Sequence, residues 1–327
     1  MNTNNRIQFF FDLTKKLLLQ NASSLPIIFI FLMIILGFGF TTERFLSIEN
    51  INNVLRQTAP SLIVGVASTL VVVAAGIDLS VGSIVSCAGV LLAVLLNRGL
   101  SAEISFIFVL LVGTLVGFAN GYFISYQGVP SFIVTLATYS ILLGVAQLLG
   151  QGFSIPIAGG TWLISIGQGY LGSIPMPVII AGCFALIFWL ILTRTKFGLY
   201  LRGIGSNEEA VRRAGVSVKM INSFAYLLNG FAAALAGIMV AARLQAGTAT
   251  AGRGLELQVI AAVVLGGTSL FGGRGTIFGT VLGVFSIALI TNGLIFNHIT
   301  PFLVTIIQGV ILLVALWVNI RLFSKLV

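Results

Sequence analysis

The sequence predicts an all-α polytopic membrane protein with about ten transmembrane helices. Of its 327 residues, 58% are hydrophobic and 8% are charged, whereas about a quarter of the residues in a soluble domain are charged. The mean hydropathy is +1.12. Apolar runs of the roughly 20 residues that a helix needs to cross a bilayer recur along the chain. Their continuous hydrophobicity excludes a β-barrel, whose strands would alternate between apolar and polar positions.

Residues 1–24 are predicted to form a cytoplasmic amphipathic segment on the membrane surface. Arg6, Lys15 and Lys16 surround a stretch rich in Phe and Leu, a combination typical of helices that lie in the interfacial layer. The first apolar run, 25–40, has no small-residue cleavage site and precedes further runs, so it is not expected to be a signal peptide. Residues 25–327 are predicted to form a single transmembrane domain.

The apolar runs that are predicted to be spans alternate in direction across the membrane. They occupy residues 25–41, 58–76, 79–97, 104–124, 131–149, 176–193, 220–242, 256–271, 275–296 and 301–320. In this layout twelve basic residues lie on the side of the two termini and five lie on the other side. The five are Arg44, Arg56, Arg98, Arg243 and Arg253. Because cytoplasmic loops hold the excess of Lys and Arg, both termini are predicted to be cytoplasmic.

The net charge of +9 is interpreted as a topology signal. The basic residues flank apolar runs and do not form a patch with interleaved aromatic residues, which argues against nucleic-acid binding. Cys87 and Cys183 both fall inside apolar spans. They are expected to act as small hydrophobic residues rather than as a disulfide or a metal-binding pair.

One charged segment, 194–219, separates two apolar blocks and holds six of the 17 basic and two of the eight acidic residues. Ser206 and Glu209 have the spacing of a capping box, so a short helix is predicted to begin at Asn207. Gly215 is predicted to end that helix in the left-handed conformation. So short a helix is not stable alone, and it therefore needs a surface to pack on.

Two spans carry glycine at helical spacing, which lets one face of each helix approach a neighbour closely. Tight helix packing is favoured over the alternative that these faces line a pore. The residues are Gly113, Gly117 and Gly121 in the fourth span, and Gly275, Gly279 and Gly283 at the ninth.

Two glycine-rich connections resemble each other. Residues 72–82 and 263–273 align at an offset of 191, with identity at both Val positions and at Gly76, Leu79 and Gly82. Both follow a predicted outside-to-inside span, so the match suggests an internal repeat in the parallel sense. Identities among Gly, Val and Leu also arise by chance, and that alternative stays open.

Three stretches resemble motifs of the permease family of bacterial ABC importers for monosaccharides, the group with the ribose, xylose and galactoside permeases and those for furanosyl signal molecules. They are Gly-Ile-Asp-Leu-Ser-Val-Gly-Ser at 76–83, Lys-Phe-Gly-Leu-Tyr-Leu-Arg-Gly-Ile-Gly-Ser-Asn-Glu-Glu-Ala at 196–210 and Leu-Gln-Val-Ile-Ala-Ala-Val-Val-Leu-Gly-Gly-Thr-Ser-Leu-Phe-Gly-Gly at 257–273. The similarity extends from about residue 45 to residue 320. These motifs are specific to the family but not to the sugar.

The resemblance implies the transmembrane permease subunit of an ATP-driven, binding-protein-dependent importer in the bacterial inner membrane. Its expected cargo is a monosaccharide, with a ribose-like pentose favoured. The implied partners are a cytoplasmic ATP-binding subunit, a periplasmic sugar-binding protein and a second permease copy or paralogue, whereas no nucleic acid is expected. The identity of the sugar stays open because the soluble partner would do most of the selecting, and so does the choice between a homodimer and a heterodimer.

ATP hydrolysis is expected on a separate subunit. The chain has no phosphate-binding loop of the pattern G-x-x-x-x-G-K-[ST], because Gly273 and Arg274 stand where Lys and Ser or Thr belong. ATP-Mg would therefore be bound by the partner ATPase. This chain is predicted to be a transport subunit without catalytic residues, metal or cofactor of its own.

The resemblance also gives the segment 194–219 a role in coupling to the ATPase. In such importers a short cytoplasmic helix with a Glu-Ala-Ala pattern followed by Gly sits in a cleft of the ATPase. Glu209-Ala210-Val211 and Gly215 match this spacing, with Val in place of the second Ala. The predicted coupling residues are Ser206, Glu208, Glu209, Ala210, Arg212, Arg213 and Gly215. Capping of the helix by Glu209, and a topology role for the arginines, are compatible readings.

Polar side chains within the spans are the candidates for a substrate path, because a sugar needs hydrogen-bonding groups that do not hold it tightly. Asp78 is a carboxylate between two closely spaced spans, and an ionisable group at membrane depth suggests function. The alternative is that Asp78 and Ser80 cap the third span. The uncharged candidates alternatively form interhelical hydrogen bonds. The predicted path residues are Asp78, Ser80, Asn120, Thr135, Gln147, Asn229 and Asn292.

Two further features are given mainly structural roles. Glu256 opens the eighth predicted span, where the helix dipole favours an acid, and pairing with Arg253 is a second expected role. The uncharged segment 150–175, which contains Trp162 and Tyr170, is expected outside the membrane. It is predicted either to meet the binding protein or to lie against the bundle.

Two other classes of function compete with an ATP-driven importer. An ion-coupled secondary transporter usually buries carboxylates or histidines at mid-membrane, and none of the eight acidic residues lies at the centre of a predicted span. An intramembrane enzyme is disfavoured because the H-E-x-x-H and G-x-S-x-G motifs are both missing.

Overall fold

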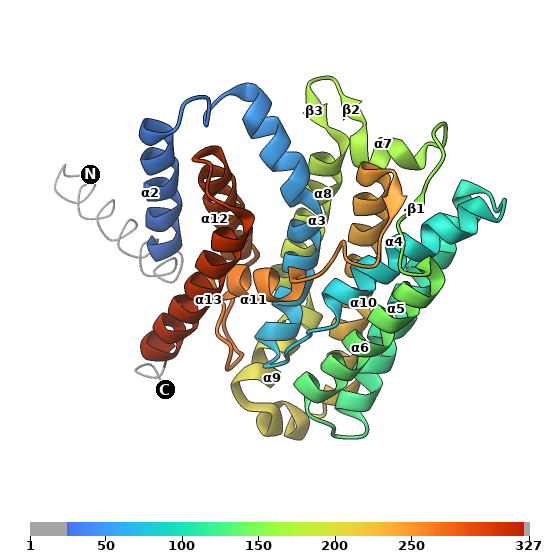
Figure 1. Cartoon of the computed structure of the whole chain (residues 1–327). Helices are drawn as coiled ribbons and strands as arrows, with labels where there is room; N and C mark the ends of the chain where they lie inside the picture. Colours follow the sequence, from blue (N-terminus) through green and yellow to red (C-terminus); the bar gives the residue numbers. More distant parts are fainter. Residues whose placement is uncertain (1–24, 324–327) are drawn as a thin grey trace, which may run out of the picture.

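The computed structural model describes residues 25–323, so the predicted amphipathic segment 1–24 lies outside the described residues. This part of the chain forms a helical bundle with four two-residue strands (Figure 1). The helices are α2 (Leu25–Thr41), α3 (Ile48–Val73), α4 (Val81–Asn97), α5 (Ala102–Ser125), α6 (Ser131–Gly150), α7 (Leu163–Gln168), α8 (Met176–Arg194), α9 (Lys196–Arg213), α10 (Val218–Leu244), α11 (Leu255–Leu265), α12 (Ile277–Phe296) and α13 (Pro301–Phe323). The strands are β1 (Ile155–Pro156), β2 (Tyr170–Leu171), β3 (Ile174–Pro175) and β4 (Ala246–Gly247).

The helices confirm the prediction of a polytopic membrane protein. In the described part of the chain, six helices are long and apolar enough to cross a membrane, namely α3, α5, α6, α8, α10 and α12. Shorter apolar helices occupy Pro26–Thr41, Val81–Asn97, Leu255–Leu265 and Phe302–Ile311. Each predicted span overlaps one of these helices.

The helix α3 begins earlier than predicted, at Ile48 rather than at residue 58. The Ser47 hydroxyl caps it by accepting a hydrogen bond from the Asn50 backbone N at 3.2 Å. The polar residues of its first turns lower the local hydropathy, which is why the sequence placed them outside the span. Asn50 is nevertheless buried, because its Nδ2 donates to the Phe45 carbonyl at 2.8 Å and to Asn292 Oδ1 at 2.9 Å.

The eighth predicted span, 256–271, is wrong in length because α11 ends at Leu265. Its 11 residues extend about 16 Å, roughly half of the hydrocarbon thickness. The chain turns after the helix, with Gly267 at a φ of +85°. The backbone of Gly279 in α12 lies so close to Gly266 that a Cβ there would clash.

The helices α3 and α10 form the buried centre of the bundle. Within the most apolar 18 residues of each, 83% and 72% are buried, compared with 22%, 11% and 28% for α5, α6 and α8. Two hydrophobic clusters surround α3 and α10 and contain residues from most of the other helices. The apolar outer faces of α5, α6 and α8 are of the kind that marks a membrane-contacting surface.

The glycines of the fourth span bring α5 against α10. A Cβ at Gly113 would lie 2.9 Å from the Gly230 carbonyl oxygen, and a Cβ at Gly121 would lie 2.6 Å from the Ser223 Cα. At Gly117 it would clash with the Tyr226 carbonyl oxygen. The packing interpretation of this stripe is therefore confirmed, since backbones can approach this closely only where side chains are absent.

The glycines at the ninth span have the same role between α12 and α11. A Cβ at Gly279 would clash with the Gly266 carbonyl oxygen, and a Cβ at Gly283 would clash with that of Ala262. Gly275 precedes α12, and a Cβ there would lie 2.7 Å from side-chain atoms of Val73 and Thr268. Packing is confirmed for this set as well.

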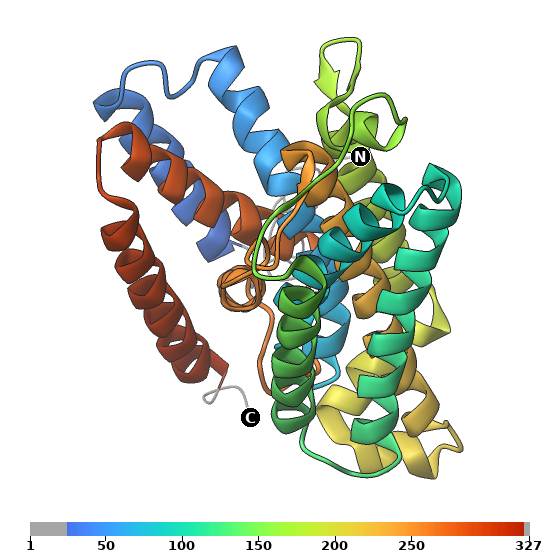
Figure 2. The same cartoon turned by 45° about the vertical axis from the view of Figure 1, so that its right-hand side comes forward.

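The bundle has two different ends. The end that carries α9 also holds the end of α13, and we refer to it as the α9 end (Figures 1 and 2). The opposite end, the capped end, carries α7 and the short strands. Here β1 pairs antiparallel with β4, and β2 pairs antiparallel with β3. The segment 150–175 lies against the bundle, where Trp162 Nε1 donates to Glu103 Oε1 at 2.8 Å.

Two irregular segments lie against the helices of the bundle. Residues 74–80 connect α3 to α4, and Asp78 and Ser80 within them are 4% and 0% exposed. Residues 248–254 lead from β4 to α11 along α4, where Gly252 N donates to Ser86 Oγ at 2.9 Å. Irregular backbone at membrane depth is tolerated only where the protein buries it or a cavity is lined by it.

The two glycine-rich connections with similar sequences lie side by side. The backbone N of Gly273 donates to the Val73 carbonyl at 2.8 Å. Gly205 of α9 packs onto both, because a Cβ at that position would clash with the Val73 carbonyl oxygen and with Gly273 N. The segment 194–219 thus has the packing surface that its length requires, while the internal repeat stays a prediction.

Candidate functional site

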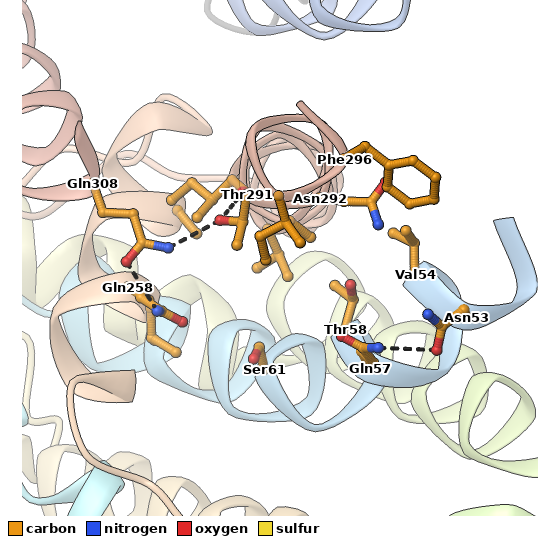
Figure 3. Close-up of a pocket in the computed structure, with 16 residues that line it drawn as sticks. Asn53, Val54, Gln57, Thr58, Ser61, Gln258, Thr291, Asn292, Phe296 and Gln308 are labelled. Atoms are coloured by element: carbon orange, nitrogen blue, oxygen red, sulfur yellow. Dashed lines mark hydrogen bonds between the residues drawn. The ribbon is translucent and has the colours of Figure 1, made fainter. Parts of the chain in front are cut away.

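A cavity of about 290 Å³ lies between α3, α11, α12 and α13. Its wall combines apolar side chains with amides and hydroxyls, and it contains no charged residue (Figure 3). We call it the amide cavity. Its polar lining residues are Asn53, Gln57, Thr58, Ser61, Gln258, Thr291, Asn292 and Gln308.

Hydrogen bonds between neighbouring helices fix several of these amides. Gln308 Nε2 of α13 donates to Thr291 Oγ1 of α12 at 2.9 Å, and Gln258 Nε2 of α11 donates to Gln308 Oε1 at 3.3 Å. On the other wall, Gln57 Nε2 donates to Asn53 Oδ1 at 2.9 Å (Figure 3). The cavity therefore presents oriented amide groups from helices that are far apart in the sequence.

The amide of Asn292 in α12 is held by hydrogen bonds to Asn50 of α3. Asn50 Nδ2 donates to Asn292 Oδ1 at 2.9 Å, and Asn292 Nδ2 donates back to Asn50 Oδ1 at 3.0 Å. This reciprocal pair joins α12 to α3 beside the amide cavity. It also leaves Asn292 with less capacity to bind a solute than Gln57 or Gln258, since an amide has two donors and one acceptor oxygen with two lone pairs.

The amide cavity suits a small neutral solute with several hydroxyl groups. Its volume is near the lower end of the roughly 300–1,000 Å³ of ligand pockets. Amides and hydroxyls offer both donors and acceptors, as a polyol requires. No charge in the wall would favour an ion over a neutral molecule.

A second group of polar residues surrounds Asp78. Asp78 Oδ1 accepts from Ser80 N at 2.9 Å and from Ser80 Oγ at 2.6 Å, and Asp78 Oδ2 accepts from Asn229 Nδ2 at 2.9 Å. Asn229 Oδ1 accepts from Ser68 Oγ of α3 at 3.0 Å. The carboxylate thus connects the 74–80 segment to α10 and, through Asn229, to α3.

The same network continues to α5 and α6. Asn120 Nδ2 donates to Ser80 Oγ at 2.9 Å, and Thr138 Oγ1 donates to Asn120 Oδ1 at 2.6 Å. Nearby, Thr135 Oγ1 donates to the Ser131 carbonyl at 2.8 Å and lies 3.5 Å from the Ile77 carbonyl. We call Ser68, Asp78, Ser80, Asn120, Thr138 and Asn229 the Asp78 network. It holds four of the predicted path residues in direct hydrogen bonds.

The alternative prediction, that Asp78 and Ser80 cap the helix α4, is confirmed only in part. Ser80 stands at the start of α4 but makes no side-chain capping bond. Asp78 binds the Ser80 backbone N, which fixes the turn before the helix rather than its first turn. Buried polar groups need such partners because leaving them unpaired is costly.

At the α9 end, the predicted helix begins with a different cap. Asn207 has a φ of −161° and a ψ of 95°, which interrupts α9, and its Oδ1 accepts from Ala210 N at 2.9 Å. The predicted capping box of Ser206 and Glu209 is therefore wrong, because Asn207 occupies the capping position. Gly215 ends the segment at a φ of +81°, as predicted.

Glu209 points to the arginines of its own turn. It pairs with Arg212 and, at 2.9 Å, with Arg213. The hydrogen bond from Arg213, together with that from Arg212, lowers the pKa of Glu209, so the carboxylate stays charged at neutral pH. Arg212 and Arg213 are exposed. This last turn of α9 therefore presents a mixed-charge surface to the solvent.

The inner side of α9 borders a cavity of about 610 Å³. Glu208 and Arg212 line it together with Lys219 and Tyr226 of α10 and with residues of the α5–α6 connection. It lies at the α9 end, where the 74–76 backbone also reaches it. Among the described residues, no group of three or more His, Cys, Asp or Glu side chains forms a metal site here or elsewhere.

A protein family described as "branched-chain amino acid transport system / permease component" matches residues 50–316. The chain belongs to this permease family. With its apolar helices, the permease is therefore a multi-pass protein of the inner membrane.

Several curated proteins are similar to the permease over most of its length. The "ribose import permease protein" of Haemophilus influenzae is 36% identical over 301 residues, which cover 91% of this chain and 93% of the relative. The protein of the same name in Escherichia coli K12 is 35% identical over 311 residues, or 94% and 95% of the two chains. The "D-allose transport system permease protein" of E. coli K12 is 32% identical over 299 residues, or 91% of each. No solved structure matches the permease.

The predicted path residues fall into three places in the permease. Asp78, Ser80, Asn120 and Asn229 meet in the Asp78 network, and Thr135 lies beside it. Asn292 lines the amide cavity. Gln147 is exposed on α6 and joins neither group.

Sequence reasoning missed most residues of the amide cavity, although a signal was present. Asn53, Gln57 and Ser61 follow one another at every fourth position, so they share one face of α3. The hydropathy of the region excluded the first two from the predicted span. Gln258 and Gln308 lie in largely apolar helices, and only the packing of α11 and α13 brings them together.

Two buried carboxylates, Asp78 and Glu256, are relevant to the alternative of an ion-coupled transporter. Asp78 and Glu256 are 4% and 9% exposed. Glu256 Oε1 accepts from Gly254 N at 3.2 Å, which supports the predicted role at the helix start. The expected pairing with Arg253 is absent from the ion pairs that the described residues form.

Proposed function

We propose that this permease is the transmembrane subunit of an ATP-driven, binding-protein-dependent importer that moves a monosaccharide, with a ribose-like pentose favoured. The observation that carries the proposal is the amide cavity, a charge-free wall of amides and hydroxyls in a chain whose relatives include ribose and allose permeases. A neutral polyol can form hydrogen bonds with the amides and hydroxyls of this wall without leaving a buried charge unpaired.

The proposed path of the sugar leads through the amide cavity. Gln57, Gln258 and Gln308 would make the direct contacts, because their helices converge there. The Asp78 network would hold the surrounding helices rather than bind the sugar. Thr135 and Gln147, which were predicted as path residues, have no place in this path.

The proposed energy source is a partner ATPase that binds ATP-Mg and docks at the α9 end. Glu209, Arg212 and Arg213 are accessible to it, and Gly205 joins α9 to the connections after α3 and α11. Movement of α9 would therefore shift both connections as a unit. This arrangement suits alternating access by largely rigid-body motion.

The α9 end is proposed to be cytoplasmic, and a second copy or paralogue of the permease is proposed to complete the importer. A periplasmic sugar-binding protein would deliver the cargo at the capped end. The capped end carries Arg56, Arg98 and Arg243, three of the few basic residues that the charge count assigns to the outside.

The test is uptake by proteoliposomes that contain the permease, the ATPase and the binding protein. Ribose, xylose and allose are compared with internal ATP and without it. The proposal expects ATP-dependent accumulation of at least one of them. Accumulation that follows a proton or sodium gradient without ATP would instead favour the ion-coupled alternative, to which the buried Asp78 and Glu256 give some support.

The coupling role of α9 has its own test in the same assay. Glu209→Lys reverses the charge that holds Arg212 and Arg213, and Gly215→Val strains a backbone at a φ of +81°. Both variants are expected to insert normally but to lose ATP-dependent uptake. Glu43→Lys, an exposed carboxylate outside α9, is the control. Wild-type uptake in both α9 variants would refute the coupling role.

A further inference from the structure

A second cavity, of about 450 Å³, adjoins the amide cavity at the capped end. The two share Asn53 and Gln57. The other lining residues of the second cavity are Arg56, Gln168, Arg243 and Leu244. Unlike the amide cavity, it is therefore lined by two charged groups, the guanidinium groups of Arg56 and Arg243.

The backbone of Arg243 is held by the end of α7. Gln168 Nε2 at the end of α7 donates to the Arg243 carbonyl at 2.8 Å. The neighbouring Gly167 lies so close to α10 that a Cβ there would clash with Arg243 N. The Arg243 side chain is partly buried, and its Nη1 is buried without a hydrogen-bond partner. An unpaired donor on a charged group is costly, and the described residues supply no acceptor for this Nη1.

Arg56 has only neutral partners. Its Nη1 donates to Tyr170 Oη at 3.3 Å, and its guanidinium carbon lies 5.8 Å from the centre of the Tyr170 ring. The ion pairs among residues 25–323 are those of Glu209 at the α9 end, so the described residues give neither Arg56 nor Arg243 a carboxylate. Two positive charges thus share one cavity without a counter-charge.

We propose that Arg56 and Arg243 form a binding site for the anionic group of a small solute at the mouth of the amide cavity. Guanidinium groups bind carboxylates and phosphates through paired hydrogen bonds that are stronger than those between neutral groups. Asn53 and Gln57, at the junction of the two cavities, are placed to bind hydroxyls of the same molecule. A sugar acid or sugar phosphate has the chemistry that fills both compartments.

A small solute fits this site better than an acidic side chain of a docking protein. The unpaired Arg243 Nη1 is buried in the structure rather than exposed at its surface. Asn53 and Gln57 also line both this cavity and the amide cavity. The sugar part of the ligand rests on the proposed function, whereas the anion site does not.

The experiment measures binding to the full-length permease in lipid nanodiscs by titration calorimetry. The probes are ribonate, ribose and inorganic phosphate, each at low and high salt. The variants are Arg56→Gln, Arg243→Gln and Arg243→Lys. Arg98→Gln is the matched control, because Arg98 is an exposed arginine at the end of α4 that does not line the cavity.

Ribonate is expected to bind about tenfold or more tightly than ribose, as the strength of a charged hydrogen bond implies. The advantage is expected to disappear in Arg56→Gln and Arg243→Gln and to persist in Arg98→Gln. In Arg243→Lys it should be reduced but not lost, because Lys keeps the charge without the planar fork. Phosphate that binds in place of ribonate, with the same arginine dependence, would support the site and identify phosphate as the preferred group.

Equal affinity for ribonate and ribose, together with no phosphate binding, would overturn the proposal. An equal loss in Arg98→Gln would also overturn it, since general surface charge would then be the cause. Because the titration needs no transport, a failure of sugar uptake leaves its result unaffected. Thermal stability of each variant excludes unfolding as a cause.

Discussion

Asp78 shows how one buried carboxylate can organise several helices. It accepts three hydrogen bonds, two from Ser80 and one from Asn229, and those partners extend the connection to Ser68 and Asn120. Both carboxylate oxygens are thereby occupied. At this scale the polar residues of the permease divide into those that satisfy each other and those, such as Gln57, that face a cavity.

Replacing Asp78 by Ala should destabilise the permease. The substitution leaves the Asn229 amide and the Ser80 backbone N buried without their acceptor, which costs about 2–4 kcal/mol in the free energy of unfolding. Asp78→Asn should also destabilise, because its amide NH₂ would face a donor. Thermal melting in detergent measures the effect, with the exposed Glu43→Ala as control. An unchanged melting temperature in Asp78→Ala would contradict the role of the network.

Replacing Gln258 by Leu should weaken sugar uptake without affecting stability to the same degree. The loss of one hydrogen bond to the solute is expected to raise the half-saturating sugar concentration about two- to tenfold. The control is Gln147→Leu, the same exchange at an exposed position of α6. Equal effects of the two exchanges on the half-saturating concentration would argue against the amide cavity as the path.

At the scale of elements, the permease depends on close backbone contacts between α5 and α10 and between α11 and α12. Glycines make these contacts, since neighbouring carbonyl oxygens occupy the space that a Cβ would need. In lipid, helices gain little from hydrophobic burial against each other, so such packing contributes a large share of their association. The short α11 and the irregular segments beside it follow from the same close packing.

A single methyl group at Gly117 should disturb the α5–α10 contact. The Cβ of Gly117→Ala would clash with the Tyr226 carbonyl oxygen, and overpacking of this kind costs about 1–3 kcal/mol. Gly144→Ala is the matched control, because a Cβ on this α6 glycine meets nothing within 4 Å. The yield of monodisperse protein and its melting temperature should fall for Gly117→Ala alone. Equal yields and equal melting temperatures of the two variants would show that the α5–α10 contact does not limit the stability of the permease.

At the scale of the whole molecule, the permease has two chemically different ends with the amide cavity between α3 and the α11–α13 group. The α9 end holds the segment that carries the mixed charges of Glu209, Arg212 and Arg213. The capped end holds the short strands and the cavity with Arg56 and Arg243. The proposed importer requires such an asymmetry, because its ATPase would dock at the α9 end and its cargo would arrive at the capped end.

Cysteine labelling should place the two ends on opposite sides of the membrane. In a background with Cys87 and Cys183 replaced by Ser, Ser206→Cys is expected to react with an impermeant maleimide only in inverted vesicles. Arg98→Cys is expected to react only in right-side-out vesicles. Both positions are exposed, so accessibility reports the side rather than burial. Labelling of Ser206→Cys from outside would refute a cytoplasmic α9 end.

Much of the architecture could be predicted because membrane helices follow from local hydrophobicity. A run such as 104–124 is continuously apolar, and in lipid the backbone must then be helical. Glycine spacing in that run also predicted its packing face correctly. The prediction failed at α11, which ends at Leu265 beside the close contact of Gly266 with Gly279, and at the first turns of α3, which are polar and begin at the Ser47 cap.

The sequence by itself determined the helical membrane class, the permease family motifs and the left-handed end at Gly215, because each depends on residues close together in the chain. The tertiary structure alone decided which polar groups meet. Asn229 reaches Asp78 and Gln308 reaches Gln258 across separations of 151 and 50 residues, and no local pattern encodes such contacts. Whether a buried polar residue holds helices together or faces a cavity depends on its neighbours in space, since only they can supply or withhold its hydrogen-bond partners.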